Sequence, residues 1–134
     1  MAPFDSADYA PAPAITPAHL ARPASGHDRL RMLATFLDDV PPEKFDIGFY
    51  WCGTKGCAMG WAASIPSFRA AGWLLSDRDQ APQYQGYVSY DAASAFFGIT
   101  VDEAYDLFST CNPENITAQE VAANIRSLLE RVST

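Results

Sequence analysis

The sequence has few cysteines and no apolar run long enough to cross a bilayer. A membrane-spanning helix needs about 20 consecutive apolar residues, and no such run occurs in the 134 residues. The N-terminus also lacks the basic start and continuous apolar segment of a secretory signal. Three cysteines, an odd number, cannot make a closed set of disulfides. These absences predict a cytoplasmic protein that does not bind membranes.

The motifs that mark common catalytic and cofactor sites are missing as well. The chain has no phosphate-binding loop, no dinucleotide-binding fingerprint, no His-Glu-x-x-His zinc motif and no calcium-binding loop. Ser64, in the tripeptide Ala-Ser-Ile, does not sit in a nucleophile elbow. We therefore predict no cofactor, and the sequence favours a non-enzymatic protein.

Basic residues are absent from one long part of the chain. No Lys, Arg or His lies between Arg78 and Arg126, whereas seven Asp and Glu residues do. The rest of the chain holds nine acids and nine bases, so this segment accounts for the whole net charge of −7. A field of one sign repels nucleic-acid phosphates and attracts cationic surfaces.

Two interpretations of this acidic segment are open. It is either a solvated face that keeps the protein soluble or a surface that binds a basic protein partner, including one that normally holds nucleic acid. Under the second interpretation, the predicted partner-binding residues are Asp91, Asp102, Glu103, Asp106, Glu114 and Glu120.

Prolines divide the chain into two parts. Residues 1–24 contain five of the ten prolines, a density that cannot propagate a helix or a strand ladder, so we predict an extended arm. Residues 25–134 are predicted to form a single globular helical domain, because 49% of the chain is apolar and its length is that of one domain.

Capping signals and apolar periodicity predict four to five helices. A leucine-rich stripe predicts a helix over 25–40 that ends at two prolines, and a second helix covers 57–65 and ends at Pro66. Gly60, inside that second helix, predicts close approach of another element. A third helix runs from Asp91 to a C-terminal cap at Gly98.

Two further helices begin with capping boxes. Thr100 and Glu103 open a helix to about residue 109, whose inward residues are predicted to include Tyr105. The box at 117–120 opens the last helix, whose apolar stripe extends to Val132.

Alternating residues predict a short strand at 45–51, and one strand or a hairpin arm at 83–90. The predicted fold is therefore mainly α, a compact bundle of four to five helices with a short strand or hairpin. The predicted core is Leu33, Phe36, Leu37, Trp61, Ile65, Phe96, Phe97, Phe108, Val121, Ile125 and Leu128.

The helix pair joined by Gly98-Ile99-Thr100 has the helix, short turn and helix order of a helix-turn-helix motif. A DNA-reading version needs basic or amide side chains on its second helix. This second helix carries Asp102, Glu103 and Asp106 and no base. The sequence thus predicts an ordinary packed helix corner and no direct binding to nucleic acid.

Cysteine chemistry is the main alternative to a docking function. Cys52 and Cys57 supply two of the four ligands of a structural zinc site, and the other two would come from Cys111 and either His19 or His27. They are also close enough in sequence for a disulfide, which a reducing cytosol disfavours. Cys57 alone is a candidate nucleophile, because a helix N-terminus and Lys55 both lower a thiol pKa. The sequence favours the other interpretation, in which Cys57 is a small buried apolar residue on the face of Trp61 and Ile65.

Several short segments together carry a resemblance. They are Phe45-Asp46, the run CGTKGCAMGWA at 52–62, FFGI at 96–99, Leu107-Phe108 and TAQEVAANI at 117–125. With them the chain resembles a loose group of small uncharacterised bacterial and phage proteins that share a CGT-x-x-C-x-x-GWA core. The similarity covers about residues 28–132. The resemblance implies a shared small fold and a phage or mobile-element origin, and it implies no activity.

The sequence therefore predicts a small accessory or inhibitor protein that binds a basic protein, such as host defence machinery, through an acidic C-terminal helical surface. The alternative is a thiol-dependent enzyme or zinc module centred on Cys52 and Cys57.

Overall fold

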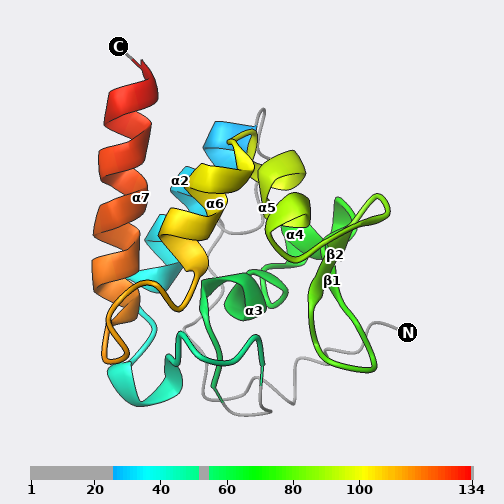
Figure 1. Cartoon of the computed structure of the whole chain (residues 1–134), viewed down its shortest axis with the longest axis horizontal. Helices are drawn as coiled ribbons and strands as arrows, with labels where there is room; N and C mark the ends of the chain where they lie inside the picture. Colours follow the sequence, from blue (N-terminus) through cyan, green and yellow to red (C-terminus); the bar gives the residue numbers. More distant parts are fainter. Residues whose placement is uncertain (1–25, 52–54, 134) are drawn as a thin grey trace.

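The computed structural model describes residues 26–51 and 55–133, so the predicted arm at 1–24 and Cys52 lie outside the described residues. The described chain is mainly α-helical, as predicted, with a small antiparallel sheet (Figure 1). None of its helices combines the length and the apolar character needed to span a bilayer. The helices are α2 (Gly26–Leu37), α3 (Ala58–Ala62), α4 (Pro66–Ala70), α5 (Ser89–Phe97), α6 (Val101–Phe108) and α7 (Ala118–Ser133), with a 3-10 turn, η2 (Pro42–Lys44).

The first and last helices, α2 and α7, lie along one another (Figure 1). Each buries one apolar stripe, with Leu30 and Leu33 on α2 and Val121 and Ile125 on α7. Burial of such side chains contributes about 1.5–3 kcal/mol each. This pair therefore forms one wall of the core.

Side chains from α7 bind the end of α2. The amide of Gln119 donates to the carbonyl of Leu37, the last residue of α2, at 3.1 Å, and to the carbonyl of Val40 in the turn that follows, at 2.8 Å. Arg126 forms two hydrogen bonds with the Asp38 carboxylate, the shorter at 2.6 Å. The pair is half exposed and so adds only a few tenths of a kcal/mol, but it fixes the register between the two helices.

Local capping signals determine how α5, α6 and α7 begin and end. Gly98 adopts a left-handed conformation (φ 68°) and ends α5. At α6, Thr100 and Glu103 form the predicted capping box, with distances of 2.9 and 3.0 Å. The same reciprocal bonds join Thr117 and Glu120 before α7. These three predictions are confirmed.

The sheet differs from the prediction. Residues 45–51 form no strand; Phe45 makes only a single parallel bridge to Gly56, because a turn in which Asp46 accepts from the Gly48 amide interrupts the alternation. The segment at 83–90, predicted as one strand or a hairpin arm, takes part in a hairpin of β2 (Pro82–Tyr84) and β3 (Tyr87–Val88), and its last two residues begin α5. A strand that was not predicted, β1 (Leu74–Leu75), completes the order β1-β2-β3.

Two predictions about the helices are also wrong, one about where a helix ends at a proline and one about which side of α6 is buried. Pro66 was predicted to end a helix over 57–65, but α3 stops at Ala62 and Pro66 begins α4, since proline fits the first turn of a helix. Tyr105 was predicted to face inward but is 47% exposed, and Leu107 takes the buried position on α6.

The predicted core is confirmed: each of its eleven residues is buried. The structure adds an aromatic cluster that the sequence analysis missed in part. Trp73 and Phe68 pack against Phe96 and Phe97, with ring centroids 4.9–6.0 Å apart. This cluster holds α5, and with it the α5–α6 corner, against the rest of the molecule.

Candidate functional site

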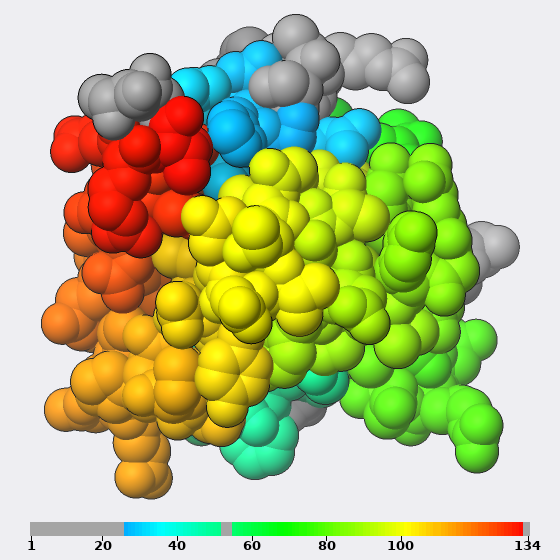
Figure 2. All heavy atoms as spheres, turned by 45° about the horizontal axis from the view of Figure 1, so that its top comes forward, coloured from blue at the N-terminus to red at the C-terminus, as the bar shows by residue number. Residues whose placement is uncertain are grey.

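The six acids singled out in the sequence lie on or next to three consecutive helices. Asp91 is in the first turn of α5, Asp102, Glu103 and Asp106 are on α6, Glu114 precedes α7, and Glu120 is in the first turn of α7. Glu103 is half-buried and the other five are exposed. Figure 2 shows α6, in yellow, between α5 in yellow-green and α7 in orange to red on one side of the molecule. We call these six residues, with the outward side of α6, the acidic face.

The negative charges of the acidic face are not matched by ion pairs within the described residues. The salt bridges found there join Arg31 to Asp28, Lys55 to Asp46, and Arg126 to Asp38. Arg126, the base that closes the acidic segment in the sequence, is thus paired with Asp38, just after the end of α2, instead. Of the six carboxylates, those of Glu103 and Glu120 accept helix-capping hydrogen bonds, and the other four have no ion pair within the described residues.

Helix ends explain the positions of some of these acids. Asp91, Asp102, Glu103 and Glu120 lie in first helical turns, where the helix dipole stabilises a negative charge. Asp106 has no such role, because it lies in the second half of α6. Asp106 is therefore the acid whose position most needs another explanation.

The outward side of α6 combines acids with apolar side chains. Val101 is 44% exposed and Tyr105 is 47% exposed, one helical turn apart, and Asp102 and Asp106 adjoin them at helical spacing. The Tyr105 ring packs edge-on against Tyr90, with centroids 5.3 Å apart. Tyrosine is enriched at protein interfaces, and the exposed acids beside it add a negative field that attracts basic partners. Sequence periodicity missed this feature because it assigned Tyr105 to the core.

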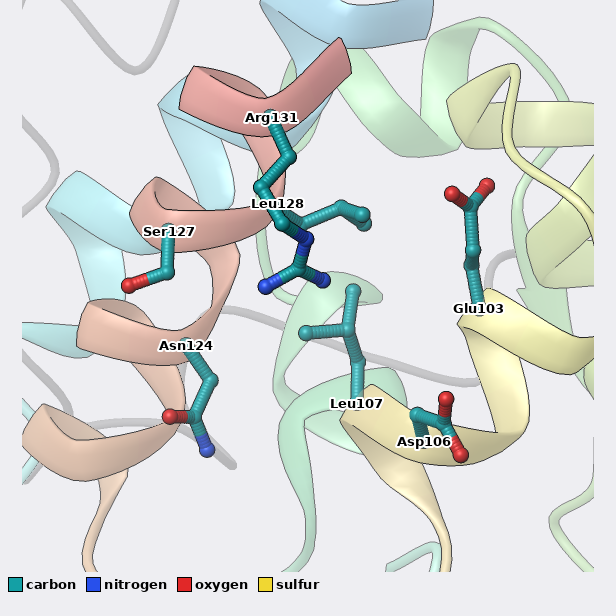
Figure 3. Close-up of a pocket in the computed structure, with 7 residues that line it drawn as sticks. All are labelled: Glu103, Asp106, Leu107, Asn124, Ser127, Leu128 and Arg131. Atoms are coloured by element: carbon teal, nitrogen blue, oxygen red, sulfur yellow. The ribbon is translucent and has the colours of Figure 1, made fainter.

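A groove of about 170 Å³ separates α6 from α7 (Figure 3). Glu103 and Asp106 line it on the α6 side, and Leu107 and Leu128 supply apolar surface. Figure 3 shows the side chain of Arg131 reaching from α7 into the groove, with its guanidinium group beside Leu107. The remaining lining residues are Asn124 and Ser127.

Helical spacing in the sequence places residues 103, 106 and 107 on one face of α6. It likewise places residues 124, 127, 128 and 131 on one face of α7. It does not reveal that the two walls face each other, because that depends on the α6–α7 packing.

Cys57 lies in the core and not in an active-site cleft. It is 2% exposed and immediately precedes α3. Burial raises the pKa of its thiol to about 11, and backbone hydrogen bonds offset only part of that effect. The sequence-based argument that Lys55 lowers this pKa is wrong, because Lys55 lies 3.5 Å from the Asp46 carboxylate and burial dominates. A thiol kept protonated in this way is a poor nucleophile and a poor metal ligand.

We expect the buried thiol and one tyrosine to make stability decline in alkaline solution. Burial raises the pKa of Cys57 from 9.0 to about 11 and that of Tyr90 from 10.0 to about 12. The folded state therefore holds these protons more tightly than the unfolded chain, and this stabilisation is complete below about pH 9 and is lost as the pH rises through 11. Urea unfolding at pH 8, 9.5 and 11 measures the decline, and Cys57→Ala should flatten its first part. Equal curves for both proteins would contradict the buried, protonated thiol.

Within residues 26–51 and 55–133, no group of three His, Cys, Asp or Glu side chains is placed so that it could hold a metal ion. The predicted ligands Cys52 and His19 lie outside these ranges. His27 instead contacts the carbonyl of Gly98 through its Nε2 atom, at 3.1 Å.

A second cavity, of about 760 Å³, lies beside the sheet. The hydroxyl groups of Tyr50 and Ser89 are 2.7 Å apart at its edge, and Ser89 has a positive φ of 55°. Serine catalysis also needs a base. Among the described residues the only histidine is His27, which does not line this cavity. The Tyr50–Ser89 contact thus joins the 45–51 segment to the first residue of α5.

Comparison of the chain with protein-family models, with curated proteins and with solved structures found no match. The resemblance to small bacterial and phage proteins thus stays a prediction. The acidic face and the groove between α6 and α7 are the features of the structure that bear on function.

Proposed function

We propose that this protein is a non-enzymatic accessory or inhibitor protein, a compact helical body that binds a basic protein through its acidic face. One observation carries the proposal. The outward side of α6 exposes Val101 and Tyr105 beside Asp102 and Asp106, and no ion pair within the described residues involves these two acids.

The chemistry of this surface fits a cationic protein better than other partners. Exposed acids repel nucleic-acid phosphates and anionic headgroups, and they accelerate the approach of a basic surface. An exposed tyrosine supplies the apolar contact that holds a complex after the charges have brought it together. A protein whose basic groove normally binds nucleic acid has a surface of this complementary kind.

Three substitutions test the proposal without removing helix caps. Asp91→Asn, Asp102→Asn and Asp106→Asn, combined, remove three charges from the acidic face. The matched control, Asp39→Asn with Glu43→Gln and Asp77→Asn, removes three charges from exposed acids outside that face. Both proteins have the same net charge, so a difference between them reports where the charge lies.

A ten-residue arginine peptide serves as the defined probe, with binding measured by fluorescence anisotropy at about 0.02 and 0.15 M salt. We expect the acidic-face variant to bind about tenfold more weakly than the control, because three partly exposed charges together contribute about 1.4 kcal/mol. The wild-type affinity should fall at the higher salt, where the screening length is about 8 Å. Salt-independent binding, or equal affinities of the two variants, would contradict the proposal.

Capture from cell extracts extends the test to proteins. Immobilised wild-type protein and the two variants are incubated with the same extract, and the retained proteins are identified by mass spectrometry. A partner of the proposed kind is basic, is retained by the control and is lost from the acidic-face variant.

A further inference from the structure

The groove between α6 and α7 has two kinds of surface that suit one type of side chain. Leu107 and Leu128 offer apolar contact, and Glu103 and Asp106 place carboxylates along one wall. Arginine and lysine side chains combine an apolar stem with a charged head, and they bury the stem while the head stays near polar groups. The groove therefore matches a long cationic side chain.

The size of the groove limits what it can hold. Its volume is about 170 Å³, close to that of an apolar protein cavity of about 150 Å³ that holds benzene. A planar guanidinium group and part of its stem fit this space, whereas a helix or a strand does not.

The chain already places an arginine there. Arg131, in the last turn of α7, lines the groove, and Figure 3 shows its guanidinium group between the two helices. Arginine suits such a partly apolar position better than lysine does, because its planar head is more weakly hydrated and can form paired hydrogen bonds with a carboxylate.

We propose that this groove binds an arginine side chain of the basic partner, and that Arg131, in the wall of the groove, weakens this binding because its positive charge repels the incoming guanidinium group. This inference rests on the proposed docking function and adds the pocket, the residue type and a control on affinity. The groove stays open with Arg131 in its wall, so the effect of Arg131 on affinity comes from its charge and not from blocking the space.

Arg131→Gln tests this repulsion. We expect this variant to bind the ten-residue arginine peptide about fivefold more tightly than the wild type, since the groove wall then lacks a charge of the same sign as the ligand. Arg78→Gln is the matched control: it also removes one positive charge, but Arg78 lies between β1 and β2, outside the groove. Its affinity should stay within about twofold of the wild type, because a distant exposed charge is largely screened at 0.15 M salt.

Two further measurements identify the pocket. In a background of Glu103→Gln and Asp106→Asn, the gain in peptide affinity from Arg131→Gln should disappear. The glutamine at position 103 keeps the helix cap, because its side-chain oxygen can accept the same hydrogen bond from the Thr100 amide. A ten-residue lysine peptide should bind the wild type more weakly than the arginine peptide, and this preference should be lost in the same background.

The outcomes separate this inference from the proposed function. The proposal of an arginine pocket is wrong if Arg131→Gln and Arg78→Gln change the peptide affinity equally, or if the arginine and lysine peptides bind with equal affinity. In either case, weaker binding by the combined Asp91, Asp102 and Asp106 variant would still support the acidic face. If neither peptide discriminates between the acidic-face variant and its charge-matched control, the docking function fails and the pocket fails with it.

Discussion

Gly60→Ala is expected to lower the free energy of unfolding by about 3 kcal/mol or more, the upper end of the range for overpacked cores. A Cβ atom at Gly60 would overlap the carbonyl oxygen of Tyr50 and crowd its carbonyl carbon at 2.8 Å. Both are backbone atoms, and Gly60 lies in α3, whose five residues are all buried. Neither side can move without displacing part of the core.

The segment that would be displaced is held at several points. The Cys57 amide donates to the carbonyl of Phe49 (2.8 Å), and the Trp61 indole donates to the carbonyl of Lys44 (2.9 Å). The Trp51 ring packs edge-on against Trp61, with centroids 4.8 Å apart. Moving Tyr50 away from α3 would weaken these contacts together, so the loss exceeds that of one added methyl group.

Gly48→Ala provides the matched control for this experiment. Its added Cβ would meet only the Asp46 carboxylate, at 3.2 Å, and Gly48 is exposed. Urea unfolding followed by tryptophan fluorescence should show a change within about 0.5 kcal/mol. Equal stabilities of Gly60→Ala and the wild type would show that the Tyr50 backbone does not pack on α3.

The sequence predicted those features that depend on neighbouring residues. The boxes at Thr100 and Thr117 and the cap at Gly98 act within one helical turn, and all three are present. The close approach at Gly60 was also predicted, because a buried glycine inside a helix needs a packing reason.

Features that depend on distant residues were missed. Tyr105 and Leu107 are both consistent with a one-sided apolar stripe over eight residues, and only the packing of α6 on α5 and α7 decides which is buried. The Asp38–Arg126 pair joins residues 88 positions apart. Helix packing also determines which residues face each other across the groove. Sequence patterns therefore predicted the acids Glu103 and Asp106 as binding residues but could not predict the pocket that they line.

Trp73 was also missed, because residues 67–90 carry no clear periodicity. It is fully buried, and its indole nitrogen donates to the carbonyl of Met59 at 3.1 Å. Its ring contacts Phe96 and Phe97, at centroid distances of 4.9 and 5.6 Å. Trp73 thus connects α3 with the C-terminal half of α5, which leads into α6 and the acidic face.

We expect Trp73→Ala to cost about 4 kcal/mol of stability, the usual loss for a large buried aromatic side chain. Trp73→Phe should cost about 2 kcal/mol, because it keeps most ring contacts but leaves the Met59 carbonyl without its donor. The control Tyr87→Ala, at a side chain that is 52% exposed, should change stability little.

The same variants test whether the core supports the docking surface. If the Trp73 contacts position α5, then Trp73→Phe should broaden or shift the NMR signals of α6 residues such as Tyr105, whose ring rests on Tyr90 of α5, while the protein stays folded. A Trp73→Phe protein with unchanged α6 signals would mean that the acidic face keeps its shape independently of this cluster. The α5–α6 corner would then owe its geometry to the caps at Gly98 and Thr100 alone.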